Sequence, residues 1–397
     1  MGAQIASISF FMYIYAKCSN MKIVCDKNIP FIEGAMDDYA EVIYMKGSDI
    51  KASDVKDAGA IVTRTRTICN KELLEGSSVK LITTATIGYD HIDTGWCAQN
   101  GIEWANAPGC NSGSVQQYMA SLLIEMSRRF GFDCKEKTLG IVGAGNVGSK
   151  VARIAALLGF RIIINDPPRA RREGASAFVT LDELIEKSDI ITCHVPLIKY
   201  GPDCTYHLFD SERISRLRRD QILINTSRGS VVDCNALRQA LSQKTILAAA
   251  LDVWENEPAI DTELMKLLFC GTPHIAGYSI DGKANGTETC VRNIGRFFDL
   301  GCKDWTIEMV PIPAQPLEFT IDAQDKHYRQ VLQEAILYSY DIMADCKRLT
   351  ASPETFEQQR SDYPIRREFG AFTVKVENDP TGRCEIFLRE AGFQISE

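Results

Sequence analysis

The sequence predicts an α/β protein with two lobes, each built on a doubly wound parallel sheet, and a small C-terminal α/β domain. Short apolar runs alternate with helix-like stretches through residues 21–300, as expected for parallel strands joined by crossover helices. A glycine-rich turn follows one of these runs at residues 143–148. At 397 residues the chain is too long for a single ordinary core, so two or three domains are expected.

The first lobe is predicted from four apolar runs, each followed by a polar or helix-like stretch. These runs are residues 22–26, 41–45, 60–64 and 80–86. EWANAPG (103–109) ends this series at a Pro-Gly turn. Residues 1–20 precede the series and are interpreted as an N-terminal extension. Their apolar part is about 12 residues long, short of the ~20 that a spanning helix needs, so a peripheral membrane role is the lesser alternative.

The second lobe opens with a helix over 114–130, where apolar residues recur at three- and four-residue spacing after a serine N-cap. A second series of strands and helices follows it. The expected strands are residues 138–143, 161–165, 189–195, 221–227 and 246–253. Helix-like stretches separate them, such as 181–187 and 234–242. A further amphipathic stretch at roughly 282–300 returns the chain, which suggests two hinged lobes with a cleft between them.

The alternation of strand-like and helix-like stretches ends near Gly301. Three prolines within 310–316 indicate a linker or an extended edge. Residues 326–349 are predicted to be helical, whereas 370–378 and 383–393 are predicted to be short strands. The expected domains are an extension (1–20), a substrate-binding lobe (21–113 and 285–302), a dinucleotide-binding domain (114–284) and a C-terminal domain (303–397).

Composition argues against several classes of function. The net charge is −8 and no basic stripe runs through the chain, so we expect no nucleic-acid partner. The 14 cysteines are scattered, without a C-x-x-C pair, and several lie in apolar runs. This distribution favours reduced, buried thiols in a cytoplasmic protein over a disulfide framework. We expect no membrane span and no metal site.

The run Gly143-Ala-Gly145-Asn146-Val147-Gly148 has the form G-x-G-x-x-G, between a strand and a helix. The glycines allow a tight turn, close approach of a pyrophosphate and helix–strand packing, and the helix N-terminus faces the phosphates. Asp166 ends the next strand, where an acid binds the ribose 2′-hydroxyl. This pattern predicts NAD binding. Nearby arginines (169, 171 and 172) could favour NADP, but a solvated basic loop is the preferred interpretation.

Three residues at predicted strand ends have the chemistry to oxidise a 2-hydroxy acid. Arg228 offers a planar fork for the substrate carboxylate. His274 can carry a proton near neutral pH, and Glu257 can orient and stabilise its imidazole. Because ligands gather at the carboxyl ends of the strands in an open parallel sheet, the three should converge. His194, also near a strand end, is the reserve candidate for the proton carrier.

The chain resembles the D-2-hydroxyacid dehydrogenase family over essentially all of residues 21–300. The motifs that carry the resemblance are the glycine motif, NTSRG with VVD, LDVWENEP and PHIAGY. The resemblance implies two Rossmann-like lobes and catalysis by the arginine, glutamate and histidine of these motifs. It also implies a set of cofactor-binding positions: Gly143, Gly145, Asn146, Val147, Gly148, Asp166, Thr226, Ser227, Asp252 and Gly277.

Further strings, TATIGYDHID (84–93) and SIDGKANGT (279–287) among them, resemble members of the family that act on a small phosphorylated hydroxy acid. The resemblance then implies a homodimer held by the C-terminal domain. It places Thr65, Thr86 and Tyr278 at the substrate, and TRTRT (63–67) offers Arg64 for a phosphate. A plain exposed edge strand is the alternative for TRTRT. Arg366 and Arg367 could reach a partner's cleft.

Two other functions stay open at this point. One is a different dehydrogenase of the same family, such as a 3-phosphoglycerate dehydrogenase whose C-terminal domain binds an amino-acid effector. The other is a nicotinamide-sensing binding protein that keeps the fold without turnover. The intact Arg228, Glu257 and His274 favour an enzyme.

Overall fold

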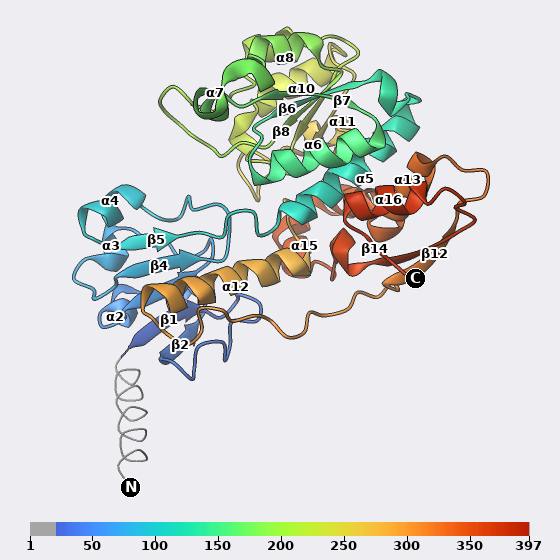
Figure 1. The fold of residues 1–397 in the computed structure, drawn as a ribbon. Helices are drawn as coiled ribbons and strands as arrows, with labels where there is room; N and C mark the ends of the chain where they lie inside the picture. Colours follow the sequence, from blue (N-terminus) through green and yellow to red (C-terminus); the bar gives the residue numbers. More distant parts are fainter. Residues whose placement is uncertain (1–20, 397) are drawn as a thin grey trace. The chain divides into compact units, whose positions relative to one another are not determined.

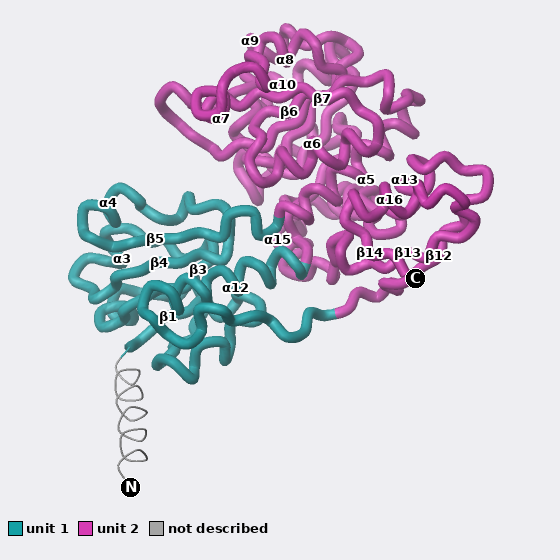
Figure 2. Tube along the Cα trace, in the orientation of Figure 1, with its two compact units in different colours: residues 1–111, 280–311 teal, residues 112–279, 312–397 magenta. Residues whose placement is uncertain are grey.

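The computed structural model describes residues 21–396. The chain forms two compact units (Figures 1 and 2). Unit 1 comprises the residues up to Asn111 together with Ile280–Pro311, and unit 2 comprises Ser112–Ser279 together with the residues from Ile312 onward. Each unit contains a parallel sheet with helices on its faces, so the predicted α/β class is confirmed.

Unit 1 is built on a five-stranded parallel sheet of order β2-β1-β3-β4-β5. Its strands are β1 (Lys22–Asp26), β2 (Glu41–Met45), β3 (Ala60–Thr63), β4 (Leu81–Thr84) and β5 (Glu103–Ala105). Its helices are α2 (Ala52–Val55), α3 (Lys71–Leu74), α4 (Thr94–Gln99) and α12 (Ile280–Phe297). All four apolar runs predicted to be strands are therefore strands.

The two faces of this sheet carry separate apolar clusters, because successive strand side chains point to opposite sides. On β1, Ile23 packs with Val291 and Ile294 of α12 on one face. Val24 packs with Val55 of α2 on the other face, where helices α3 and α4 also bury apolar residues. Figure 1 shows α12 along one side of the sheet.

Unit 2 contains a six-stranded parallel sheet of order β11-β10-β9-β8-β6-β7. Its strands are β6 (Thr138–Val142), β7 (Arg161–Asn165), β8 (Ile190–Cys193), β9 (Ile222–Asn225), β10 (Ala248–Leu251) and β11 (Cys270–Gly271). Its helices are α5 (Ser112–Phe130), α6 (Asn146–Leu158), α7 (Pro167–Glu173), α8 (Leu181–Lys187), α9 (Ser211–Ser215), α10 (Cys234–Ser242) and α11 (Thr262–Leu267).

The C-terminal part of unit 2 adds a small three-stranded parallel sheet, order β12-β13-β14. Its elements are β12 (Glu318–Asp322), α13 (Tyr328–Ser339), α14 (Ile342–Ala351), α15 (Phe356–Ser361), β13 (Thr373–Glu377), α16 (Arg383–Ala391) and β14 (Gln394–Ile395). Helices α13 and α16 pack on each other and lie beside α5 and α6 (Figure 1). The apolar residues of α13 and α16 belong to the same hydrophobic cluster as the residues on one face of the six-stranded sheet. The C-terminal segment and this sheet therefore share one core.

Residues 326–349, predicted to be helical, form two helices, α13 and α14, separated after Ser339. One prediction for the C-terminal segment is wrong. Residues 383–393 form helix α16 followed by a glycine turn, and not a strand. The buried residues of α16 are Cys384, Leu388 and Ala391, a spacing of four and three that is helical. A short apolar run does not by itself distinguish the two periods, which explains the error.

Other predictions concern thiols and the N-terminus. The cysteines between residues 21 and 396 are all free thiols and most are buried, as predicted. None of the helices in this described range is long and apolar enough to cross a membrane. The predicted extension at 1–20 lies outside the described residues.

The helical assignment of 383–393 can be tested by comparing Leu388→Ala with Ile386→Ala. In α16 the Leu388 side chain is fully buried, whereas Ile386 is 54% exposed. Leu388→Ala should lower the free energy of unfolding by about 2–5 kcal/mol, and Ile386→Ala by less than about 1 kcal/mol. Urea denaturation of the full-length chain measures both. Equal losses would contradict the helix, since residues two apart share one face of a strand.

Candidate active site

The glycine-rich turn joins β6 to α6, and each glycine has a different reason to lack a side chain. Gly143 has φ +85°, and a Cβ there would collide with the backbone of His194 and the side chain of Val195. A Cβ on Gly148 would collide with the carbonyl of Gly143, so this glycine lets α6 pack on the turn. A Cβ on Gly145 would meet nothing within 4 Å.

Open space therefore lies over Gly145, at the N-terminus of α6, where backbone N–H groups and the helix dipole favour an anion. A pyrophosphate can approach the backbone there. These residues fit a dinucleotide cofactor.

Asp166 follows β7 and lies beside this turn. One carboxylate oxygen accepts a hydrogen bond from the amide of Ala144 (2.8 Å), and the other caps α7 by accepting from the amide of Arg169 (3.0 Å). The arginines expected in a solvated loop belong instead to helix α7. Each of them pairs with an acid of the chain: Arg169 and Arg172 with Glu173, and Arg171 with Asp203.

His194, the reserve proton carrier, is half-buried and directly follows β8. Its ring nitrogens contact the hydroxyls of Thr192 (3.0 Å) and Thr226 (3.1 Å). Burial lowers the pKa of His194 to about 3, so its imidazole stays neutral near pH 7. A neutral imidazole bonded to two hydroxyl groups is better suited to orienting Thr226 than to exchanging protons with a substrate.

The turn after β9 positions Arg228. The Asn225 amide group donates to the carbonyl of Arg228 (2.9 Å), and its oxygen accepts from the amide (3.1 Å) and hydroxyl (2.7 Å) of Ser227. A Cβ on Gly229 would collide with the backbone of Trp254, in the segment that leaves β10. The loop carrying Arg228 is therefore packed directly on the segment that leads to Glu257.

Glu257 and His274 form a hydrogen-bonded pair, with 2.7 Å between Oε2 and Nδ1. The other oxygen, Oε1, accepts from the amide of Trp254 (2.8 Å). Burial would raise the pKa of Glu257, but the hydrogen bond and charge of His274, the Trp254 amide and the charge of Arg360 together lower it. An ionised carboxylate only accepts hydrogen bonds, so Nδ1 carries the proton and Nε2 is the nitrogen that can receive one.

The loop that carries His274 is held by a buried carboxylate. His274 has φ +56°, a left-handed conformation that costs a non-glycine residue about 1–2 kcal/mol. Asp252, which is 1% exposed, accepts hydrogen bonds from the amides of Ile275 (2.7 Å) and Ala276 (2.9 Å) and from the hydroxyl of Thr272 (2.7 Å). Its backbone carbonyl accepts from the amide of His274 (2.7 Å). The sequence predicted a role for Asp252 at the cofactor, but it did not predict that this carboxylate holds the loop of His274.

Tyr278 lies on the same loop, after Gly277, and contacts the C-terminal segment. Its ring meets that of Tyr363 edge-on, with centroids 5.9 Å apart. Its hydroxyl accepts a hydrogen bond from Nη2 of Arg360 (2.9 Å). Arg360 was not predicted from the sequence, because no local motif marks a residue so far along the chain.

The remaining predicted substrate residues lie in unit 1. Strand β3 ends at Thr63, so Arg64 and Thr65 lie beyond the strand, with Thr65 in a turn, and most of TRTRT (63–67) is not a strand. Arg64 donates to the carbonyl of Asn28 (2.9 Å). Because β3 is a central strand, the exposed-edge alternative is also wrong. Thr86 follows β4, and its hydroxyl donates to the carbonyl of Gly88 (2.7 Å).

Arg366, one of the two arginines suggested from the sequence to reach a partner's cleft, is buried within its own chain. It is 6% exposed, and Nη2 donates to the carbonyl of Ala276 (2.7 Å) and to the hydroxyl of Ser114. Its guanidinium lies over the ring of Tyr340, 4.5 Å from the centroid. Arg366 thus fastens the C-terminal segment to the loop after His274.

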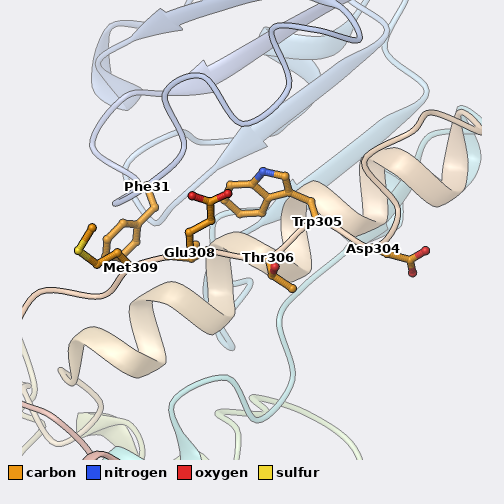
Figure 3. Close-up of a pocket in the computed structure, with 7 residues that line it drawn as sticks. Phe31, Asp304, Trp305, Thr306, Glu308 and Met309 are labelled. Carbon is orange, nitrogen blue, oxygen red and sulfur yellow. The ribbon is translucent and has the colours of Figure 1, made fainter.

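A hollow of about 540 Å³ in unit 1 is separate from all these residues. It lies between the loop after β1 and the segment after α12 (Figure 3). The side chains that line it include Phe31, Asp304, Trp305, Thr306, Glu308 and Met309. No predicted site residue lines it, and within residues 21–396 no cluster of three or more His, Cys, Asp or Glu could hold a metal ion.

Solved structures with the same fold include several dehydrogenases. D-lactate dehydrogenase from Aquifex aeolicus, complexed with NAD and lactic acid, matches with a TM-score of 0.58 and 27% identity, covering 70% of this chain and 95% of that one. NAD-dependent formate dehydrogenase from Staphylococcus aureus, in complex with NAD, matches with a TM-score of 0.56 and 24% identity, covering 74% of this chain and all of that one. The second likeness concerns the fold alone.

Sequence comparisons are more specific. The family model described as D-isomer specific 2-hydroxyacid dehydrogenase, NAD binding domain, matches residues 112–276. Erythronate-4-phosphate dehydrogenase from Bacteroides thetaiotaomicron is 49% identical over 89% of this chain and 99% of its own length. The enzyme of that name from Porphyromonas gingivalis is 40% identical over 89% of this chain and 95% of its own length. The chain therefore belongs to the NAD-dependent D-isomer specific 2-hydroxyacid dehydrogenases, and among them to the family of the erythronate-4-phosphate dehydrogenases.

Proposed function

We propose that this protein oxidises 4-phospho-D-erythronate to (R)-3-hydroxy-2-oxo-4-phosphobutanoate with NAD, a step of pyridoxal 5′-phosphate biosynthesis. The observation that carries the proposal is the hydrogen-bonded pair of His274 and Glu257. The loop of Arg228 packs on the segment that leads to Glu257, and the same sheet carries the glycine-rich turn that fits a dinucleotide. The substrate is the one named in the relatives, which match along nearly their whole length.

The cofactor is proposed to lie over the carboxyl edge of the unit 2 sheet, where it would accept the hydride from C2 of the substrate. Asp166 is proposed to bind the ribose, which favours NAD because a carboxylate repels a 2′-phosphate. The residues proposed to hold the cofactor are Gly143, Gly145, Asn146, Val147, Gly148, Asp166, Thr226, Ser227, Asp252 and Gly277.

Arg228 is proposed to bind the substrate carboxylate, because a guanidinium meets the two carboxylate oxygens with parallel N–H bonds. His274 then takes the proton of the C2 hydroxyl at Nε2, while Nδ1–H stays bonded to Glu257. The lowered pKa of Glu257 keeps this carboxylate ionised near neutral pH. Its negative charge stabilises the imidazolium that forms as the hydroxyl loses its proton.

The substrate's other end carries a phosphate, which needs a cation and hydroxyl groups. Arg64 and Thr65, in TRTRT (63–67), are proposed to supply them, and Thr65, Thr86 and Tyr278 are proposed as substrate-binding positions. We assign residues 21–113 with 285–302 to the substrate-binding lobe and 114–284 to the dinucleotide-binding domain. Residues 303–397 are proposed to hold a homodimer in the cytoplasm, an assignment supported by the family resemblance.

The substrate is tested by following NADH absorbance with purified protein. Among 4-phospho-D-erythronate, D-3-phosphoglycerate and D-lactate, the first should be turned over with the highest kcat/KM. A parallel reaction containing a 2-oxo acid acceptor controls for NADH that stays bound to the enzyme. Preference for another hydroxy acid would contradict the substrate but keep the dehydrogenase mechanism. Absence of turnover with all three would contradict both.

The role of Asp252 in holding the His274 loop is tested by Asp252→Asn. The amide would place N–H groups against backbone N–H groups, so the free energy of unfolding should fall by about 1–3 kcal/mol and kcat should fall with it. Thermal melting and steady-state kinetics measure the two effects. Asp182→Asn, at a carboxylate 68% exposed, is the matched control. Wild-type kcat in Asp252→Asn would contradict the assignment.

A further inference from the structure

The loop after His274 has a second anchor besides the Asp252 carboxylate. This anchor is the hydroxyl group of Ser114, which is fully buried in the first turn of α5. The hydroxyl donates a hydrogen bond to the carbonyl of Ala276 (2.8 Å) and accepts one from the amide of Ser279 (3.0 Å). The loop is therefore tied to α5 at two points, on either side of two residues.

Arg366 of the C-terminal segment completes this anchor. Its Nη2 donates to the carbonyl of Ala276 (2.7 Å) and to the hydroxyl of Ser114. A hydroxyl group has one proton to donate and two lone pairs that accept. Its partners Ala276, Ser279 and Arg366 use all three of these positions on Ser114. The place of the Ala276 carbonyl thus depends on a residue 90 positions further along the chain.

A buried network of the C-terminal segment holds Arg366 in turn. Its guanidinium lies 4.5 Å from the centroid of the Tyr340 ring, a favourable cation–π contact. Its Nη1 donates to the hydroxyl of Tyr363 (3.4 Å). The hydroxyls of Tyr363 and Tyr340 both donate to the carboxylate of Asp345 (2.6 and 2.7 Å), which is 4% exposed. Tyr363 therefore links the buried cation to a buried anion, and this link fixes the guanidinium.

The two residues that the anchor flanks are Gly277 and Tyr278, which are proposed positions for the cofactor and the substrate. Displacement of the Ala276 carbonyl would be carried directly to them, because they follow it along the backbone. The imidazole of His274 has its own anchor in Glu257, with 2.7 Å between the two bonded atoms. The anchor of Arg366 therefore bears on substrate binding more directly than on proton transfer.

We propose that Arg366 is a positioning residue for substrate binding, which acts through the Ala276 carbonyl on the backbone that carries Tyr278. The C-terminal segment then completes the binding site of its own chain, in addition to any role in assembly. The proposal rests on the function proposed above. Arg366 lies beyond residues 112–276, the part of the chain that the general family model matches.

The test compares Arg366→Lys and Ser114→Ala with wild type in the full-length chain, using 4-phospho-D-erythronate and NAD. Lysine keeps the charge but loses the planar fork. Arg366→Lys should raise KM for the hydroxy acid about three- to tenfold, as loss of one hydrogen bond implies, and should leave the pH profile of kcat unchanged. Ser114→Ala removes the hydroxyl but keeps the arginine, and it should have the same effect. Arg389→Lys, at an exposed arginine on α16, is the matched control.

A double-mutant cycle separates positioning from a general loss of structure. In a Tyr278→Phe background, Arg366→Lys should raise KM much less than in the wild type, because the hydroxyl that it positions is already gone. An equal rise of KM in both backgrounds would overturn the proposal. A fall in kcat with unchanged KM would also overturn it, because loss of folded enzyme alone has that effect.

Hydrogen–deuterium exchange gives a readout that does not depend on turnover. The amides of residues 275–279 should exchange faster in Arg366→Lys than in wild type, whereas those of strand β8 should keep their rates. Unchanged exchange at 275–279, or faster exchange throughout unit 2, would contradict the positioning role. If the wild type does not oxidise 4-phospho-D-erythronate, the proposed function fails, and the exchange experiment alone decides whether Arg366 holds the loop.

Discussion

The hydrogen bond between His274 and Glu257 is the interaction on which the arrangement of the site depends. It selects the ring nitrogen that carries the proton, and it requires two loops from neighbouring strands to meet within 2.7 Å. The Trp254 amide holds Glu257, and the buried Asp252 carboxylate holds the loop of His274 in its left-handed conformation. Burial raises the pKa of the Asp252 carboxyl group, and three donors of one loop, the Thr272 hydroxyl and the amides of Ile275 and Ala276, converge on this carboxylate.

The sheet of unit 2 brings the cofactor turn and this pair to one edge. Its order, β11-β10-β9-β8-β6-β7, places the first strand, β6, between β7 and β8, so the strand order reverses there. Ligands of open parallel sheets bind at such a reversal, beyond the carboxyl ends of the strands. Gly143 rests against the end of β8, and Gly229 rests against the segment after β10. Two glycines without room for a side chain therefore hold four loops together in two pairs, the loop after β6 with that after β8, and the loop after β9 with that after β10.

Residue patterns predicted most of the fold and the pairing of His274 with Glu257, because strand periodicity and strand-end motifs are local in sequence. Residue patterns did not predict features that depend on contacts between residues far apart in the sequence. The buried positions of α16 become evident only from its packing, since a short apolar run fits both periods. Arg360 reaches Tyr278 across 82 positions of the chain, and no spacing rule predicts such a contact. The anchoring role of Asp252 depends on loop geometry, which its motif does not specify.

The pH dependence of kcat for Glu257→Gln tests the central claim most directly. We expect a lower kcat and a pH profile that differs from that of the wild type, because the carboxylate that pairs with His274 is lost. Glu255→Gln is the matched control, since that carboxylate pairs with His207 instead. A pH profile unchanged from wild type in Glu257→Gln would contradict the account, because the pair would then have no part in proton transfer.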